Sequence, residues 1–274
     1  MGFYTATAPT QEHGTTSRTL MPLPPPAPPA VLAERLRDCE LKLPAIVHCA
    51  RPCEKLWAYR GQPALQSAVC ELRHPLSVHM RMPPFDLTAM AKAETLEMQI
   101  YQQWRRSLRG PLVMADVQRF VALCTSRDGD LRTAPVWIRA YDGRTQLAMV
   151  SAELASARWP DLLRQLAAGG LGNGMRAAVQ LLALANNAHA FADGNGRLGR
   201  ALFNFCLHRA GLRDGCYVPL KMLTVLSRGG YELRLREAEL YGRWDGLYAY
   251  HCAAIKLYLW LGKQPSSPDQ NEDV

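Results

Sequence analysis

The stretch that decides the fold is HAFADGNGRLGR, residues 189–200, which lies between two apolar segments of helical periodicity. Upstream, residues 175–191 are apolar almost all round, which is typical of a buried helix. Downstream, residues 197–211 repeat apolar side chains at helical spacing and end at Gly211. The sequence therefore predicts a helix, a tight glycine loop and a second helix.

The loop between the two expected helices carries residue types that bind phosphate. Gly194 and Gly196 allow the backbone to approach a ligand without interference from a Cβ atom, and the loop opens onto a helix N-terminus. Such a terminus presents unpaired amides and the positive end of the helix dipole. Arg197 and Arg200 are three residues apart, so both can hold phosphate oxygens from one helix face. This combination predicts a polyphosphate site.

An acid and a histidine add chemistry to that site. Asp193 is the only carboxylate in the loop, and one carboxylate together with phosphate oxygens is a usual way to hold Mg²⁺. His189 can accept a proton from an incoming nucleophile at neutral pH. Each residue alone is more often structural, as a capping histidine, a plain turn or a solvated arginine face. Together on one helix–loop–helix they favour transfer of a phosphorus-centred group.

The segment resembles the signature of the Fic family of nucleotidyltransferases, HxFx(D/E)GNGRxxR. Every specified position matches: His189, Phe191, Asp193, Gly194, Asn195, Gly196, Arg197 and Arg200. The residue after the histidine, commonly Pro in the family, is Ala190 here. Members typically transfer AMP from ATP to a Ser, Thr or Tyr hydroxyl of a target protein. The resemblance implies a mainly α fold, a Fic-type helical bundle with a short β-hairpin flap beside the active site.

The resemblance also assigns roles by position. His189 would deprotonate the target hydroxyl, and Asp193 would hold Mg²⁺ between the α- and β-phosphates of ATP. Arg197 and Arg200 would bind the β- and γ-phosphates, and Phe191 would anchor the motif in the core. Three loop amides would cradle phosphate, those of Gly194, Asn195 and Gly196.

Flanking segments extend the resemblance to about residues 110–262. GDLR, residues 129–132, is similar to the family's lead-in to the flap, and residues 136–150 contain two β-prone runs around Asp142-Gly143. The flap would hold a target segment by β-augmentation. Tyr231, in YELRLREAEL, would lie near the adenine, but the Asn often found seven residues later is Ala238. Base contacts and the choice of nucleotide therefore stay open.

Many family members carry an inhibitory helix with the motif (S/T)xxxE(G/N), whose Glu pairs with the second motif Arg. Ser67 and Glu71 have that spacing upstream of the core, although Leu72 replaces the Gly or Asn. Ser67 and Glu71 are therefore candidates for an inhibitory motif, in which Glu71 would pair with Arg200. The alternative is a plain helix-surface glutamate, and the sequence leaves open whether Glu71 inhibits.

Composition sets the domain organisation of the 274-residue chain. Residues 1–30 are rich in Pro, Ser and Thr and are expected to be a disordered leader. Residues 31–109 read as a helical N-terminal region, in which Ala93, Leu96, Ile100 and Trp104 recur at helical spacing. The expected Fic core spans residues 110–262, and residues 263–274 form a disordered acidic tail. Eight scattered cysteines without a CxxC pair read as free thiols, and HCARPC, residues 48–53, has the wrong spacing for zinc.

Charge and hydropathy narrow the classes of function. No apolar run is long enough to cross a membrane and no signal peptide is apparent, so we expect a soluble protein of the cytoplasm, or of a host cytosol if it is a delivered effector or toxin. The net charge is +8, and because residues 264–274 hold three acids and no base while residues 1–30 are neutral, the remaining residues carry +11. A basic body suits an anionic ligand.

The leading hypothesis is a protein adenylyltransferase that uses ATP and Mg²⁺ on a target protein docked at the flap. The alternatives are a Fic-type transferase of UMP, GMP, phosphate or phosphocholine, a deAMPylase, and a basic Fic-like binding module without activity. No membrane partner and no nucleic acid are expected, because no further DNA-reading helix-turn-helix follows the motif. The oligomeric state is left open by the sequence.

Overall fold

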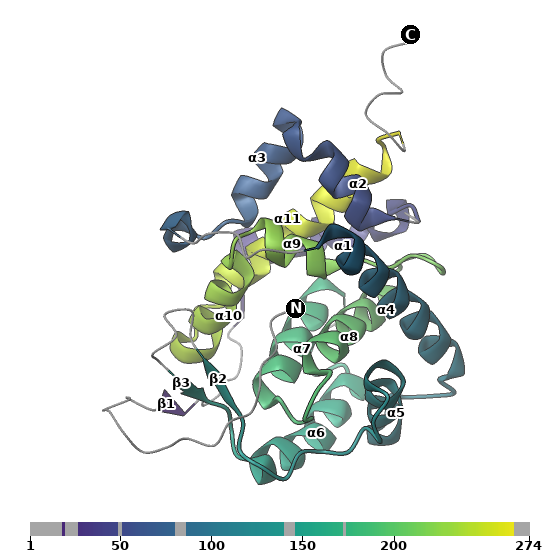
Figure 1. The fold of residues 1–274 in the computed structure, drawn as a ribbon, viewed down its shortest axis with the longest axis vertical. Coiled ribbons are helices and arrows are strands. Elements are labelled where there is room, and N and C mark those ends of the chain that lie inside the picture. Colours follow the sequence, from purple (N-terminus) through teal and green to yellow (C-terminus); the bar gives the residue numbers. More distant parts are fainter. Residues whose placement is uncertain are drawn as a thin grey trace.

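The computed structural model describes residues 18–19, 27–48, 51–79, 86–139, 146–171 and 174–265, and it is mainly helical (Figure 1). Two helices, α7 (Met175–Ala188) and α8 (Asn195–Arg209), lie side by side at its centre. They are the two helices expected around the opening motif. Gly199 lets them approach closely, because a Cβ atom there would lie 2.8 Å from Asn186 Nδ2 and 2.9 Å from Leu182 Cδ1.

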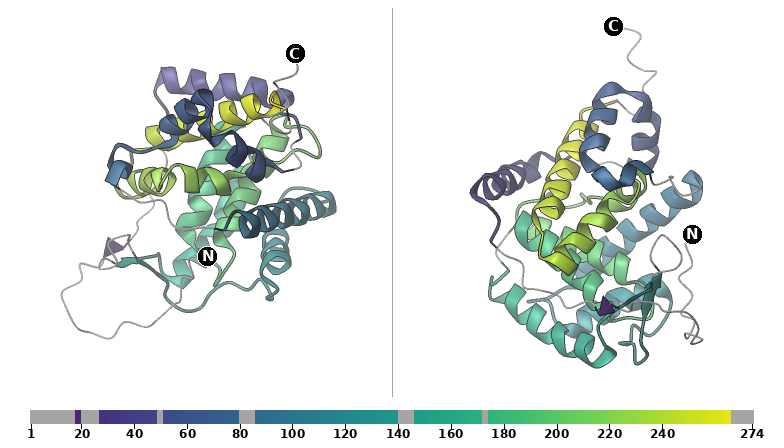
Figure 2. Two further views of the ribbon diagram at one scale, coloured as in Figure 1. Left: turned by 45° about the horizontal axis from the view of Figure 1, so that its top comes forward. Right: turned by 90° about the vertical axis from the view of Figure 1, so that its left-hand side faces the viewer.

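The remaining helices of the C-terminal part surround this pair (Figures 1 and 2). They are α5 (Met114–Thr125), α6 (Ala152–Ala167), α9 (Leu220–Leu226), α10 (Gly230–Tyr241) and α11 (Asp245–Gly262). Helix α7 is buried almost all round, as its apolar sequence predicts. The short helix α9 was not expected, because seven residues are too few to display a helical period.

The N-terminal helices pack onto the same core rather than forming a separate one. They are α1 (Ala30–Lys42), α2 (Pro52–Ala58), α3 (Pro63–Leu72) and α4 (Leu87–Ser107), joined by short 3-10 turns at Leu43–Ala45, Tyr59–Gly61 and Pro75–His79. Helix α1 lies along α11, and α3 packs on α11 and α9 (Figure 2). Helix α4 contacts both α5 and α8, so it reaches the central pair. One continuous cluster of buried apolar side chains joins these elements.

The buried face of α4 differs from the expected one. Trp104 is buried as expected, but Leu96 is 56% exposed, and Glu94, Glu97 and Tyr101 are buried instead. The expectation followed apolar periodicity, whereas Glu97 is buried because it pairs with Arg200 of α8, whose positive charge offsets the cost of burying a carboxylate.

Two short strands lie where a hairpin was expected. β2 (Trp137–Arg139) pairs antiparallel with β3 (Gln146–Ala148), with Trp137 opposite Ala148 and Arg139 opposite Gln146. The turn between them, including Asp142-Gly143, lies outside the described residues. The role of this hairpin as a flap stays a prediction.

A third strand comes from the segment that was expected to be a disordered leader. β1 (Arg18–Thr19) pairs in parallel with β3, which gives the strand order β1-β3-β2. The other residues before Ala27, and the expected acidic tail beyond Pro265, lie outside the described residues. Within the described part, no helix is both long enough and apolar enough to span a bilayer.

The thiols in the described part are free, as expected: Cys39, Cys53, Cys70, Cys124, Cys206, Cys216 and Cys252. No group of three or more His, Cys, Asp or Glu side chains there is placed to hold a metal ion, so the described part of HCARPC shows no such site.

Candidate active site

The motif loop is closed by the side chain of Asn195. Its Oδ1 accepts from Phe191 N at 3.0 Å and its Nδ2 donates to Phe191 O at 2.7 Å. Asn195 and Phe191 are buried, and the Phe191 ring meets Trp159 edge-on at 6.1 Å. The side chain of Asn195 therefore fixes the turn. Only its backbone amide is left for the expected contact with phosphate.

Two residues of the loop adopt left-handed backbone conformations. His189, which ends α7, has φ 41° and ψ 48°. Gly194, which precedes α8, has φ 85°, and a Cβ atom there would lie 2.8 Å from Thr125 Cγ2. A glycine is required at residue 194 for both reasons. The amides of the first turn of α8 have no helical acceptor and point toward the loop opening, which suits an anion.

Arg132 holds the loop from the flap side. Its backbone N–H donates to Ala190 O at 2.8 Å, and its side chain donates to the carbonyls of His189 at 2.6 Å, Ala134 at 2.8 Å and Val150. Arg132 is buried, and Leu131 and Phe191 form an isolated antiparallel bridge beside it. One arginine therefore connects the motif loop to the segment that enters β2 and to the segment that leaves β3. The sequence pointed to GDLR only as a lead-in and did not reveal this role.

Replacing Arg132 with Ala is expected to destabilise the loop and the protein. Three carbonyls, of which that of Val150 is buried, would lose their donor, which we expect to lower the free energy of unfolding by about 2–4 kcal/mol. Urea unfolding followed by circular dichroism measures this change. Arg132→Lys, which keeps the charge but cannot reach three carbonyls, should lie between the two, and an unchanged midpoint for Arg132→Ala would contradict the assignment.

His189 is half-buried at the C-terminal end of α7. Burial lowers the pKa of its imidazole to about 4, with smaller contributions from the charges of Arg132 and Arg236, while a hydrogen bond to the backbone of Asn186 opposes the shift. The ring is therefore neutral at pH 7. With one ring nitrogen engaged by Asn186, the other is free to accept a proton.

The pH dependence of the His189 ring follows from this shift. A lowered pKa means that the ring stays neutral as the pH falls through 6.5, where an ordinary imidazole is half-protonated. We expect no titration of His189 between pH 8 and about 5.5 in long-range ¹H–¹⁵N NMR spectra, with the resonance assigned by His189→Gln. A midpoint near pH 6.5 would contradict burial as the controlling factor.

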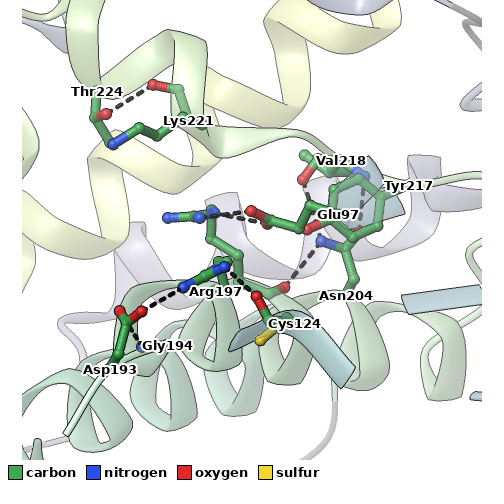
Figure 3. Close-up of polar contacts among 11 residues, drawn as sticks. Glu97, Cys124, Asp193, Gly194, Arg197, Asn204, Tyr217, Val218, Lys221 and Thr224 are labelled. Atoms are coloured by element: carbon green, nitrogen blue, oxygen red, sulfur yellow. Dashed lines mark hydrogen bonds and ion pairs between the residues drawn. The ribbon is translucent and has the colours of Figure 1, made fainter. Parts of the chain in front are cut away.

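Asp193 and Arg197 form an exposed ion pair at the loop opening (Figure 3). Arg197 Nη2 lies 2.9 Å from Asp193 Oδ2, and Arg197 also donates to the carbonyl of Cys124. Asp193 Oδ1 accepts from the amide of Gly194 at 2.6 Å. Because the Asp193 side chain is 56% exposed, a hard cation can reach it from solvent. One carboxylate fits Mg²⁺ only if phosphate oxygens and water complete the coordination.

Arg200 is paired with a carboxylate, but not with the expected one. Its Nε donates to Glu97 Oε1 at 2.8 Å and its Nη2 to Glu97 Oε2 at 2.6 Å. The hydroxyl of Tyr217 donates to Glu97 Oε1 at 2.6 Å (Figure 3). Burial alone would lower the pKa of Arg200, but the Glu97 charge more than offsets this, so the guanidinium is charged. The two-pronged pair is nearly buried, with side chains 15% and 8% exposed.

The expected contact between Glu71 and Arg200 is therefore corrected. Ser67 and Glu71 both lie exposed on α3. Arg234 of α10 donates to the carbonyls of Leu72 at 2.7 Å and Arg73 at 2.6 Å, which fixes the end of α3 against α10. The motif spacing matched, but the packing of α3 leaves Glu71 in solvent and α4 supplies the carboxylate instead.

A second glutamate lies near this pair. Burial, and then the charge of Glu97, raise the pKa of Glu94 to about 8, so Glu94 is mostly protonated at pH 7. Glu94 therefore adds little negative charge beside the Arg200–Glu97 pair at pH 7. Sequence reasoning missed Glu97, and the available signal was that Glu94 and Glu97 share a helix face with Tyr101 and Trp104.

Helix α9 brings a third cation to the site. Lys221 lies across from Arg197 and Asp193 (Figure 3), and its pKa is lowered first by desolvation and then by the charge of Arg200. Charges that repel one another in this way suit a polyanion placed among them. No motif pointed to Lys221, because α9 itself was not expected.

Tyr231, expected near the adenine, lies at the start of α10 against α7. Its hydroxyl accepts from Asn186 Nδ2 at 3.3 Å, and its ring packs on Tyr250 at 5.7 Å and His251 at 6.0 Å. Ala238, at the position where the family often has Asn, is fully buried on the same helix. It packs in the core.

A family model decides what kind of domain holds this loop: residues 114–207 match the Fic/DOC family. These residues are a Fic domain. The match covers α5, the β2–β3 hairpin, α6, α7, the motif loop and most of α8, whereas Glu97 on α4 and Lys221 on α9 lie outside it. No curated protein matches the sequence.

Solved structures share the fold over most of the chain. A Fic family protein from Desulfovibrio desulfuricans G20 superposes with a TM-score of 0.60 at 15% identity, over 87% of this chain and 75% of that one. Fic-1 from C. elegans, residues 134–508, gives a TM-score of 0.52 at 18% identity, over 84% of this chain and 72% of that one. At these identities the likeness concerns the fold alone, and it extends beyond the Fic domain into the N-terminal helices.

Proposed function

We propose that this Fic protein transfers AMP from ATP to a Ser, Thr or Tyr hydroxyl of a target protein. One observation carries the proposal. The neutral imidazole of His189 lies at one end of the motif loop, and the first-turn amides of α8 and two arginines lie at the other end. A neutral base beside a polyphosphate site is what nucleophilic attack by a hydroxyl needs. The family to which the domain belongs includes such transferases.

In the proposed reaction the target oxygen attacks the α-phosphorus of ATP. Its proton passes to the free nitrogen of His189, a bond forms between the oxygen and phosphorus, and the bond to the bridging oxygen breaks, which releases pyrophosphate. The first-turn amides of α8, Arg197 and Lys221 stabilise the charge on the phosphates. Asp193 would hold Mg²⁺, which, when bound, neutralises charge on the α- and β-phosphates.

The target side chain has space beside the loop. A cavity of about 340 Å³ lies between the end of α5, residues 127–134 and residues 191–193, on the flap side of Asp193. Because Arg132 fixes both the loop and the hairpin, a segment held by the hairpin would be held at a constant position relative to His189.

We further propose that Glu97 is the inhibitory carboxylate of this protein. It occupies two N–H groups of Arg200, the arginine expected to bind the γ-phosphate. ATP then has to displace a carboxylate from Arg200 before the triphosphate is fully bound. The Lys221 charge on the opposite wall would assist this exchange by attracting the γ-phosphate.

The donor nucleotide is tested by the position of the label. Incubation with Mg²⁺ and α-labelled ATP is expected to label the enzyme or proteins of a cell lysate, whereas γ-labelled ATP should leave them unlabelled. Transfer of the γ-label would identify a kinase-like reaction instead. Because residue 238 is a buried Ala where the family often has Asn, α-labelled UTP and GTP belong in the same experiment, and preferential use of either would replace AMP as the transferred group.

A further inference from the structure

The hairpin beside the active site has one edge covered by the chain itself. β3 carries β2 on one side and β1 on the other, and β1 runs parallel to β3 with Arg18 opposite Leu147 and Thr19 opposite Ala148. The views in Figure 2 place β1 next to the hairpin and away from the helical core. The partner of this edge therefore comes from a segment far away in sequence.

An uncovered edge of β3 would present unpaired backbone N–H and C=O groups, and a two-stranded ribbon alone is only marginally stable in water. Any extended segment without proline at the paired residues can fill such an edge, because the hydrogen bonds come from the backbone. Residues 10–21 contain no proline, between Pro9 and Pro22. The segment that contains β1 is thus suited to strand pairing.

The chain that connects β1 to α1 favours the pairing of β1 with β3, although only two residues of β1 are paired. Ten residues separate Thr19 from Ala30, where α1 begins, and a chain of that length reaches about 35 Å at most. A segment tethered in this way has an effective concentration on the order of millimolar at its site. A target segment that binds the same edge has to compete with it.

The position of this edge is coupled to the active site. Arg132 donates to the carbonyls of Ala134, before β2, and Val150, after β3, and also to that of His189. Met149 N donates to Val136 O at 3.0 Å and closes the base of the hairpin. A strand on β3 is therefore attached, through the hairpin base, to the loop that carries the proposed catalytic base.

The family resemblance already implies that a target segment pairs with this hairpin. We propose that residues 18–19, paired in parallel with β3, cover its edge in cis and act as an intramolecular competitor of an extended target segment. The part concerning the target rests on the proposed function. Occupancy of the edge by residues 18–19 does not, and it is measurable without any nucleotide.

Hydrogen exchange of the full-length chain tests this occupancy. The double variant Arg18→Pro/Thr19→Pro lacks both backbone donors of β1, and Gln11→Pro is the matched control ahead of the strand. We expect amides of residues 146–148 to exchange about thirtyfold faster in the double variant, as for the loss of about two hydrogen bonds, and to exchange at an unchanged rate in Gln11→Pro. Amides of α7 should keep their protection in both. Equal exchange at residues 146–148 in all three chains would overturn the proposal.

A synthetic peptide of residues 14–22 gives a second measurement. Added at millimolar concentration to the double variant, it should restore slow exchange at residues 146–148, and the same peptide with Pro at both paired positions should not. Transfer of α-label to lysate proteins is then compared between the double variant and Gln11→Pro, with a rise expected in the former. If no chain transfers label to lysate proteins, the proposed function is contradicted but the occupancy of the edge is not. If exchange at residues 146–148 accelerates in the double variant while label transfer does not rise, the target binds elsewhere.

Discussion

Replacing His189 with Ala is expected to abolish transfer of α-labelled AMP while ATP still binds. The imidazole is the one side chain at the loop that is both neutral at pH 7 and able to accept a proton from a hydroxyl. Loss of a general base typically lowers a rate by 10²–10⁴-fold. Label incorporation with time, at saturating ATP and Mg²⁺, measures the loss.

Two controls make this prediction specific. His208, whose nitrogens contact the carbonyls of Leu212 and Cys216 at 3.0 and 3.1 Å, lies at the far end of α8, and His208→Ala should keep the label at the level of its folded fraction. Calorimetry should give the same affinity for ATP in His189→Ala and in the native chain. Retained transfer in a folded His189→Ala protein would remove His189 from the mechanism, and lost ATP affinity would make it a binding residue instead.

The second large effect is expected at Glu97. Glu97→Gln keeps the shape of the side chain but leaves the buried guanidinium of Arg200 without a countercharge. Removal of one partner of a buried pair typically costs about 3–5 kcal/mol of folding stability. A triphosphate can supply the missing charge, so we expect a lower Tm without ligand and a larger rise of Tm on ATP addition than in the native chain.

The same variant should be more active. Since ATP no longer displaces a carboxylate from Arg200, we expect AMP transfer to rise about tenfold, within the 5–150-fold range of typical coupling energies. Glu71→Gln is the matched control, because the Glu71 side chain is exposed on α3, and its stability should stay within about 0.5 kcal/mol of the native value. Lower transfer by Glu97→Gln would show that Glu97 positions Arg200 for catalysis, and activation by Glu71→Gln would restore the inhibitory role expected from the motif.

The conformation of the loop could be predicted from the sequence because it is local. Gly194 has a left-handed backbone angle that favours glycine, and Asn195 closes a turn over four residues. Apolar residues all round α7 predict its burial. Such constraints act between residues close in sequence, so they appear as a motif of fixed spacing.

Contacts between distant segments could not be predicted in the same way. Glu97 and Arg200 are 103 residues apart, and Arg132 and His189 are 57 apart. The apolar pattern of α4 pointed to Leu96 as a core residue, whereas a buried ion pair selected the face with Glu97. The motif spacing at Ser67 and Glu71 described a helix, but it held no information about which surface that helix packs against.

By itself the sequence determined a helix–loop–helix with one imidazole at its edge and with residue types that suit phosphate, because backbone angles, helix termini and side-chain spacing act over a few residues. Only the tertiary structure decided which carboxylate holds Arg200, that Arg132 joins the loop to the hairpin, and that Arg18–Thr19 cover the edge of β3. These contacts depend on how helices and strands distant in sequence pack together, and packing of that kind is set by the whole core rather than by any local pattern.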